Sequence, residues 1–103
     1  MYKKLVRDKI PEIIKGNNQH PITRILSDEE YKIELEKKLN EEYQEVLSAT
    51  GENRIEELAD MLEVMIYLAK LENKDLKDII EVCDKKHAKR GGFDDKIYLE
   101  DVE

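Results

Sequence analysis

Two short acidic segments of the sequence place carboxylates about one helical turn apart. Residues 41–45 read EEYQE, and residues 56–60 read EELAD. On an isolated helix, like charges at this spacing repel one another and cost a little stability. Because 42% of the residues are charged and 16 of them are Glu, one match to EExxE arises easily by chance. The positions of these acids on their helices therefore decide whether they form a site.

Two helices joined by a tight turn are expected to carry the acidic segments. Ser27 and Glu30 have the spacing of a capping box, which predicts a first helix that runs to about Ser48. A second cap signal at Asn53 predicts a helix that ends near Leu71. A short connection between two such helices predicts an antiparallel hairpin.

A third helix and shorter terminal elements are expected around this hairpin. The third helix is predicted from near Asn73 to a glycine stop at Gly91. A short helix is expected after Asp8, and residues 22–25 and 97–102 are predicted to pair as short strands. Such pairing would bring the basic N-terminal segment back toward the hairpin. The expected fold class is mainly α.

Glu42 falls on the apolar face of the first predicted helix. At about 100° per residue, Leu35 and Val46 lie on one stripe, and Glu42 lies inside the same arc. It stands seven residues after Leu35, where a helix that faces a core normally carries an apolar side chain. Glu45 lies at the border of the stripe, and Glu41 points further outward.

The second predicted helix is apolar around most of its circumference and has two apolar faces. Two of its acids lie at the edge of one of these faces. A helix of this kind is buried on two sides, which fits a bundle completed by another subunit. Glu57 and Asp60 lie where the second face begins. Positions 45 and 57 are equally far from the turn, so antiparallel packing would bring Glu57 and Asp60 opposite Glu42 and Glu45. Four carboxylates would then converge.

Converging carboxylates need a cation. Buried and unpaired, they would cost many kcal/mol or take up protons. Oxygen ligands that leave room for water and phosphate suit Mg²⁺, or Mn²⁺, better than Zn²⁺. The alternative is that the acids lie on solvated faces and pair with neighbours such as Lys38 or Arg54. That alternative is favoured for Glu41, Glu56 and Glu63.

Length and composition indicate one soluble domain, residues 1–103, that associates with copies of itself. A chain of 103 residues is near the size at which a single core is only modestly stable. No apolar run is long enough to span a membrane, so a cytoplasmic protein is expected. A net charge of −7 argues against nonspecific binding of nucleic acid or anionic lipid. Cys83 is expected to be a small core residue.

The acidic segments and both ends of the chain resemble a known superfamily. EEYQEV followed by EELADMLEVM resembles the EExxE…ExxD signature of the all-α MazG-like nucleoside triphosphate pyrophosphohydrolases, which include phosphoribosyl-ATP pyrophosphohydrolases. KLVRDKIPEII at residues 4–14 and RGGF at 90–93 followed by IYLEDV resemble a small phosphoribosyl-ATP-pyrophosphohydrolase-like branch. The resemblance implies a helical bundle completed by a dimer or tetramer. It also implies Mg²⁺ ligands at Glu42, Glu45, Glu57 and Asp60.

The resemblance further implies hydrolysis of a nucleoside triphosphate between its α and β phosphates, often to clear noncanonical nucleotides. The products are a nucleoside monophosphate and pyrophosphate. Glu41 or Glu45 is expected to take the proton from the attacking water. Only eleven residues separate Glu45 from Glu57, a short spacing that tightens the hairpin. Basic side chains are expected to hold the phosphates, and the candidates are Lys4, Arg7, Lys9, Lys86, Lys89 and Arg90.

Two other functions remain open from the sequence. The first is a helical dimerisation or interaction module without catalytic activity, whose acids only keep it soluble. The second is the phosphoribosyl-ATP pyrophosphohydrolase step of histidine biosynthesis, although KLVRDKIP and the C-terminal segment look unlike that enzyme. The sequence specifies neither the base nor the sugar of a nucleotide substrate.

Overall fold

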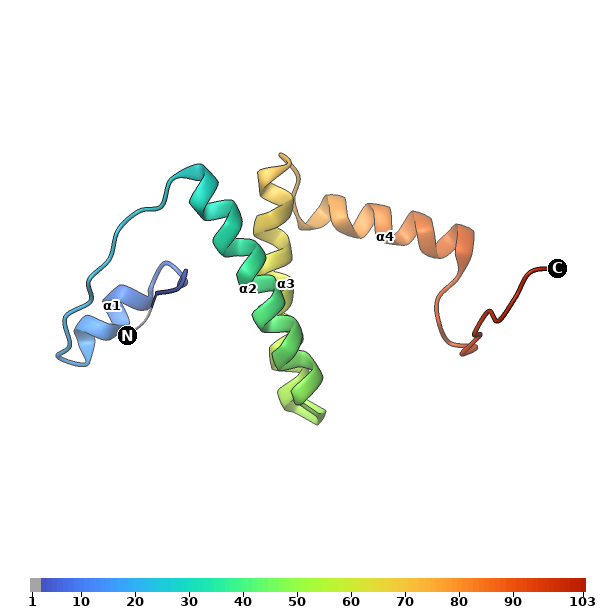
Figure 1. The fold of residues 1–103 in the computed structure, drawn as a ribbon, viewed down its shortest axis with the longest axis horizontal. Helices are drawn as coiled ribbons and strands as arrows, with labels where there is room; N and C mark the ends of the chain where they lie inside the picture. Colours follow the sequence, from blue (N-terminus) through green and yellow to red (C-terminus); the bar gives the residue numbers. More distant parts are fainter. Residues whose placement is uncertain (1–2) are drawn as a thin grey trace.

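The structure is a computed structural model that describes residues 3–103, and it is mainly helical, as predicted. The helices α2 and α3 lie side by side as an antiparallel hairpin, whereas α1 stands apart and α4 leads away from the end of α3 (Figure 1). Residues 3–103 contain no strand, so the strands expected at 22–25 and 97–102 are absent. The four helices are α1 (Ile10–Gly16), α2 (Asp28–Ser48), α3 (Gly51–Leu71) and α4 (Leu76–Arg90).

The capping box at the start of α2 is formed as predicted. The Ser27 hydroxyl accepts the Glu30 N–H at 3.2 Å, and the Glu30 carboxylate accepts the Ser27 N–H at 3.1 Å. Arg24 donates two further hydrogen bonds to this carboxylate and, with Ser27, lowers the pKa of Glu30 from 4.5 to about 2. A lowered carboxyl pKa stabilises the fold above pH 4.5, and that contribution is lost as the pH falls toward 2.

The connection between α2 and α3 is shorter than predicted. The N-cap of α3 is Thr50, three positions before the predicted cap Asn53, so the predicted start was wrong and the helix begins at Gly51. Gly51 has a φ of +60°, a backbone conformation that glycine adopts without steric cost. Only Ala49 and Thr50 therefore separate the two helices, and the Arg54 side chain donates a hydrogen bond of 2.8 Å to the Ala49 carbonyl.

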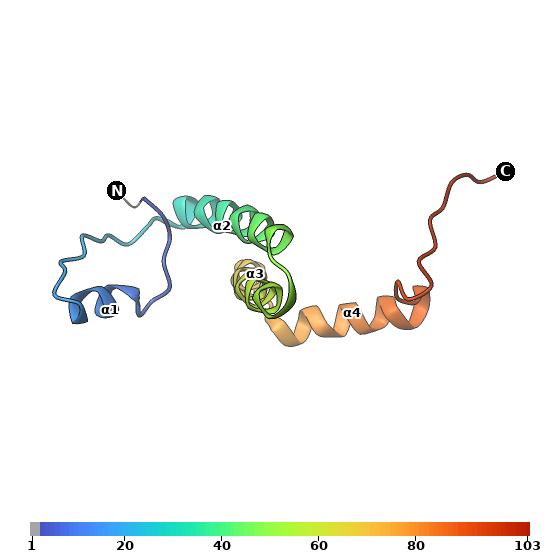
Figure 2. The ribbon, with the colours of Figure 1, turned by 90° about the horizontal axis from the view of Figure 1, so that it is seen from below.

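The core of the hairpin is small. Leu35 of α2 and Val64 of α3 are the buried hydrophobic side chains of the described residues, with 4% and 7% of their surface exposed. Figure 2 views α3 nearly end-on and shows α2 packed along one side of it. The opposite face of α3 carries Ile55, Leu58 and Leu62, which all stay exposed. Within one chain, the predicted burial of α3 on two sides is therefore met on one side only.

The helix α4 begins later than predicted. Asp75 and Asp78 form a capping box, because each side chain accepts the backbone N–H of the other residue. Asn73, where the start was predicted, has a φ of +60° and belongs to the turn after α3. The predicted end is correct, since α4 stops before Gly91, whose φ is +80°.

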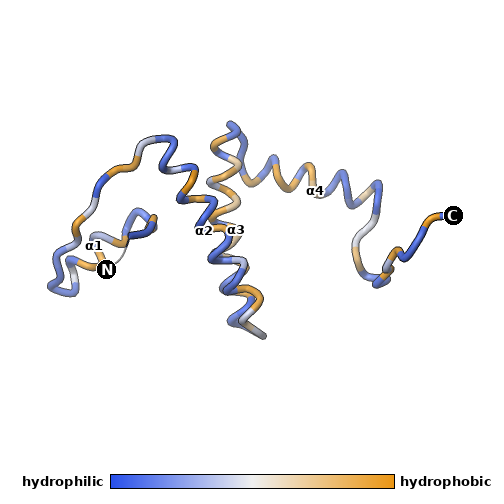
Figure 3. The backbone as a smooth tube through the Cα atoms, in the orientation of Figure 1, coloured by the Kyte–Doolittle hydropathy of each residue, from blue (hydrophilic) through white to orange (hydrophobic). Residues whose placement is uncertain are grey.

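The parts of the chain outside the hairpin are extended. The radius of gyration is 18.0 Å, whereas a compact chain of this length has about 13 Å. Hydrophobic positions recur along α3, α4 and both end segments (Figure 3). Phe93 and Ile97 are almost fully exposed, and Cys83 is exposed on α4. The expectation that Cys83 lies in the core is therefore wrong, because α4 packs on α3 only near its start.

The helices of the described residues differ from those that cross a bilayer, which need about 20 predominantly apolar residues. None of them within residues 3–103 combines the length and apolar character of a membrane span. The longest, α2 and α3, have 21 residues each and carry charged side chains throughout.

Candidate functional site

Three carboxylates from α2 and α3 converge on the hairpin. Glu42 of α2 and Glu57 and Asp60 of α3 each offer an oxygen, and these oxygens lie within 4.8 Å of one another. We call these three residues the carboxylate cluster. Antiparallel packing across the short connection brings the two helices into this register. All three residues are half-buried, so the cluster is shielded by the hairpin without being removed from water.

The other two predicted acids lie outside the carboxylate cluster. Glu45 is exposed on α2 and does not belong to the group of three. Its negative charge nevertheless raises the pKa of Glu57, so the two side chains are near neighbours. Glu41 is also exposed, and its carboxylate lies 3.9 Å from the ammonium group of Lys38. Glu41 thus has the surface ion pair that the alternative interpretation proposed.

Burial and mutual repulsion raise the pKa of two members of the carboxylate cluster. The pKa of Glu42 is raised by burial and then by the charge of Asp60, while Lys38 acts in the opposite direction. The pKa of Glu57 is raised by burial and then by the charges of Glu45 and Asp60. A raised carboxyl pKa means that the folded chain disfavours the ionised form. A cation at the cluster would remove that penalty.

The oxygen donors of the carboxylate cluster fit a hard divalent cation. Octahedral Mg²⁺ holds oxygens at about 2.1 Å, so its ligands lie roughly 3–4 Å from one another. The oxygens of the carboxylate cluster lie within 4.8 Å of one another, which is close to this spacing. Three carboxylates also leave positions for water and phosphate. Among the described residues, no histidine or cysteine joins the group, which disfavours Zn²⁺.

An arginine contacts the carboxylate cluster from the N-terminal segment. Arg7 donates a hydrogen bond of 2.7 Å from Nη2 to Oδ1 of Asp60, and its Nη1 lies 3.8 Å from a carboxylate oxygen of Glu63. The basic N-terminal segment therefore contacts the hairpin through an ion pair, whereas the strand pairing that was predicted to bring it there is absent from residues 3–103. Sequence reasoning assigned Arg7 to phosphate and missed this contact. The opposite charges of residues 1–24 and 25–84 were the available signal.

The remaining predicted phosphate ligands fall into two groups. Lys4 and Lys9 flank Arg7 in the N-terminal segment. Lys86, Lys89 and Arg90 belong to the last turns of α4, which points away from the hairpin (Figure 1). Within a single chain, the structure thus separates the α4 cations from the carboxylate cluster.

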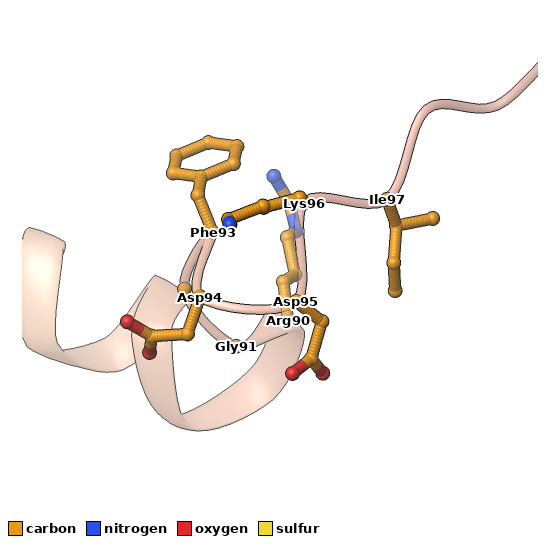
Figure 4. Close-up of a pocket in the computed structure, with 8 residues that line it drawn as sticks. Arg90, Gly91, Phe93, Asp94, Asp95, Lys96 and Ile97 are labelled. Carbon is orange, nitrogen blue, oxygen red and sulfur yellow. The ribbon is translucent and has the colours of Figure 1, made fainter.

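Two hollows of the surface lie away from the carboxylate cluster. One, of about 390 Å³, is formed by residues 90–97 in the loop after α4. Its Phe93 side chain points to the opposite side of the loop from Asp94 and Asp95 (Figure 4). The other, of about 660 Å³, lies between the end of α3 and α4 and is lined by apolar side chains such as Ile79 and Val82 together with charged side chains. Neither hollow includes a residue of the cluster.

Glu42→Gln is expected to stabilise the metal-free protein at neutral pH. Because the pKa of Glu42 is raised above 4.5 in the folded chain, its protonated form favours folding, and this stability is lost as the pH rises through the folded pKa. Glutamine carries no charge, so the variant does not lose this stability as the pH rises. The expected gain is a few tenths of a kcal/mol, the size of one like-charge pair on a helix. Urea unfolding at acidic and neutral pH measures it.

The matched control for this prediction is Glu41→Gln. Glu41 is the neighbour of Glu42 in the chain, but it is exposed and faces Lys38. Its replacement is therefore expected to give no gain at neutral pH. A Glu42→Gln protein that is less stable than the unaltered chain at neutral pH would show that the carboxylate cluster is not repulsive.

Comparisons with known proteins give one partial match. A protein from Mycolicibacterium smegmatis (strain ATCC 700084 / mc(2)155), described as an uncharacterized protein, is 49% identical to this chain over 45 residues. The match covers 44% of this chain and 46% of that relative, so it spans about half the relative's length. No family model matches the chain. No solved structure matches it either.

Proposed function

We propose that the chain is a Mg²⁺-dependent nucleoside triphosphate pyrophosphohydrolase, in which Mn²⁺ can replace Mg²⁺. It would cleave between the α and β phosphates and release a nucleoside monophosphate and pyrophosphate. The observation that supports this proposal best is the convergence of Glu42, Glu57 and Asp60 within 4.8 Å. These residues also stand at positions of the EExxE…ExxD pattern that the sequence shares with MazG-like enzymes. Clearing of noncanonical nucleotides in the cytoplasm is the proposed role.

The carboxylate cluster supplies the proposed metal ligands, with Glu45 as a fourth ligand or as the base. A bound divalent cation would neutralise charge on the phosphate oxygens and orient the attacking water. Glu45 is exposed and lies outside the group of three, which leaves its carboxylate open to the attacking water as the proposed base. Glu41 is less suited to this role because it already faces Lys38.

The proposed phosphate contacts come first from the N-terminal segment. Arg7 already lies at Asp60, so its guanidinium is within reach of an anion held at the carboxylate cluster. Lys4 and Lys9 flank it and add positive charge. The helix α4 leads away from this hairpin, so its cations would serve the site of a second copy. These cations are Lys86, Lys89 and Arg90.

We also propose that the active form is a homodimer or homotetramer. A single chain leaves one face of α3 uncovered, with Ile55 exposed over 66% of its surface and Leu58 and Leu62 beside it. Exposed apolar faces of this kind mark interfaces between proteins. Light scattering is expected to give a multiple of the 12.2 kDa chain mass. A mass of one chain at working concentration would contradict this part of the proposal.

A panel assay tests the proposed reaction. The purified protein is incubated with canonical and modified nucleoside triphosphates and with phosphoribosyl-ATP, each with Mg²⁺, with Mn²⁺ and with EDTA. Pyrophosphate and the nucleoside monophosphate are expected in equal amounts for at least one substrate, and only with metal. Release of inorganic phosphate instead would place the cleavage at a different bond. An oligomer that yields no pyrophosphate from any substrate would favour the non-catalytic association module.

A further inference from the structure

The ion pair between Arg7 and Asp60 occupies a carboxylate that the proposed metal site needs. The guanidinium donates to Oδ1 of Asp60 at 2.7 Å and lies 3.8 Å from Glu63 through its other terminal nitrogen. The two side chains keep 56% and 46% of their surface exposed. Ion pairs that are this exposed contribute little to stability, so a stronger partner can displace either member.

The segment that carries Arg7 is held on the hairpin next to the carboxylate cluster. The residue after it, Asp8, contributes to the raised pKa of Tyr31 on α2, after burial and the neighbouring Tyr67. Arg7 itself contacts α3 through its ion pairs with Asp60 and Glu63. The helix α1, which follows directly, stands apart from both (Figures 1 and 2). Release of the residues around Arg7 would therefore free the whole N-terminal segment from α3.

A divalent cation and the guanidinium compete for the same charge. A cation in the carboxylate cluster would be held by Glu42, Glu57 and Asp60, and the guanidinium of Arg7 already contacts the last of these. Repulsion between an ion of charge +2 and a guanidinium is about twice that between two single charges at the same distance. The cation also gains Glu42 and Glu57, whereas the ion pairs of Arg7 within residues 3–103 are those with Asp60 and Glu63. A divalent cation is therefore expected to bind Asp60 more strongly than the guanidinium of Arg7 does.

We infer that Arg7 is a displaceable counter-ion that neutralises Asp60 in the metal-free protein and leaves it when a divalent cation binds. Displacement turns the guanidinium toward the phosphates of an incoming nucleotide and loosens the N-terminal segment from α3. Metal binding and release of this segment are then coupled, and the coupling is reciprocal. This inference rests on the proposed function, because it requires a metal at the carboxylate cluster.

Direct Mn²⁺ titration of the full chain tests the inference without any substrate. Free Mn²⁺ is counted by electron paramagnetic resonance for the unaltered protein and for Arg7→Gln. Loss of a competing exposed ion pair is expected to tighten Mn²⁺ binding by about two- to five-fold. Lys15→Gln is the matched control, because it removes the same charge from α1, which stands apart from the hairpin. It is expected to leave the affinity unchanged.

Limited trypsin digestion gives a second measurement. In the unaltered protein, Mn²⁺ is expected to speed cleavage after Lys9 by a factor close to the affinity gain of Arg7→Gln, because cleavage follows the population of the released segment and that population is coupled reciprocally to metal binding. In Arg7→Gln, cleavage after Lys9 is expected to be fast with and without Mn²⁺. Circular dichroism of each variant verifies that the helices are retained.

The outcomes separate the inference from the proposed function. Equal or weaker Mn²⁺ binding by Arg7→Gln, with Mn²⁺ bound to the unaltered protein, would overturn the inference and leave the proposed metal site standing. The inference would also be overturned if Lys15→Gln tightened binding as much as Arg7→Gln, because the effect would then be one of overall charge. Failure of every variant to bind Mn²⁺ would overturn both the inference and the proposed function.

Discussion

Glu57→Gln is expected to lower metal-dependent pyrophosphate release at least about 100-fold, because loss of a group that only supports a metal ligand already costs 10–100-fold at metal sites. The substitution keeps the size and shape of the side chain but removes the negative charge of one carboxylate of the cluster. Glu57 belongs to none of the ion pairs found among the described residues, so the hairpin keeps those contacts. Coupled detection of pyrophosphate measures the loss.

Glu56→Gln is the matched control for Glu57→Gln. Glu56 precedes it on α3, is exposed and lies outside the carboxylate cluster, so the same charge change is expected to leave turnover within about twofold. Raised Mn²⁺ is expected to restore part of the activity of Glu57→Gln, because a lost ligand weakens metal affinity. Full turnover by Glu57→Gln would remove this residue from the site. Equal losses in both variants would indicate an effect of overall charge.

Leu35→Ala is expected to lower the free energy of unfolding by about 2–4 kcal/mol. Leu35 is 4% exposed and is one of the two buried hydrophobic side chains of the described residues, so the hairpin has little other core to compensate. Such a loss is a large part of the roughly 5–15 kcal/mol that stabilises a typical domain. Urea unfolding followed by circular dichroism measures the change.

Ile33→Ala provides the comparison for Leu35→Ala. Ile33 lies on the same helix but keeps 51% of its surface exposed, so its truncation is expected to cost less than about 1 kcal/mol. Unfolding should be measured at several protein concentrations, because association makes the midpoint concentration-dependent. Similar losses for both variants would mean that the face of α2 that carries Ile33 is buried in an assembly.

The helices could be predicted from the sequence wherever their end signals are local. The Ser27 cap of α2 and the Gly91 stop of α4 were found because side chain and backbone act within a few residues. The start of α3 was missed because Thr50 makes no side-chain cap, so its helix start has no polar signature. The strands at 22–25 and 97–102 failed because apolar alternation does not supply a pairing partner.

The candidate site was predictable in part for a similar reason. Helical periodicity placed Glu42, Glu57 and Asp60 toward the partner helix, and their oxygens do converge. The same periodicity put Glu45 at the border of the stripe, and in the structure this residue is exposed and lies outside the group. The contact of Arg7 with Asp60 joins residues 53 positions apart, and no periodic pattern reports such a contact.

The two-residue connection between α2 and α3 has a consequence for the order of folding. Three Cα steps of about 3.8 Å barely cover the roughly 8–10 Å between the axes of packed helices, so the connection has little slack. Closure of the hairpin alone therefore sets the register of Glu42 against Glu57 and Asp60. Contacts that are this local in sequence form on the microsecond scale. The carboxylate cluster would thus assemble before the ends of the chain dock, and it would outlast their fraying.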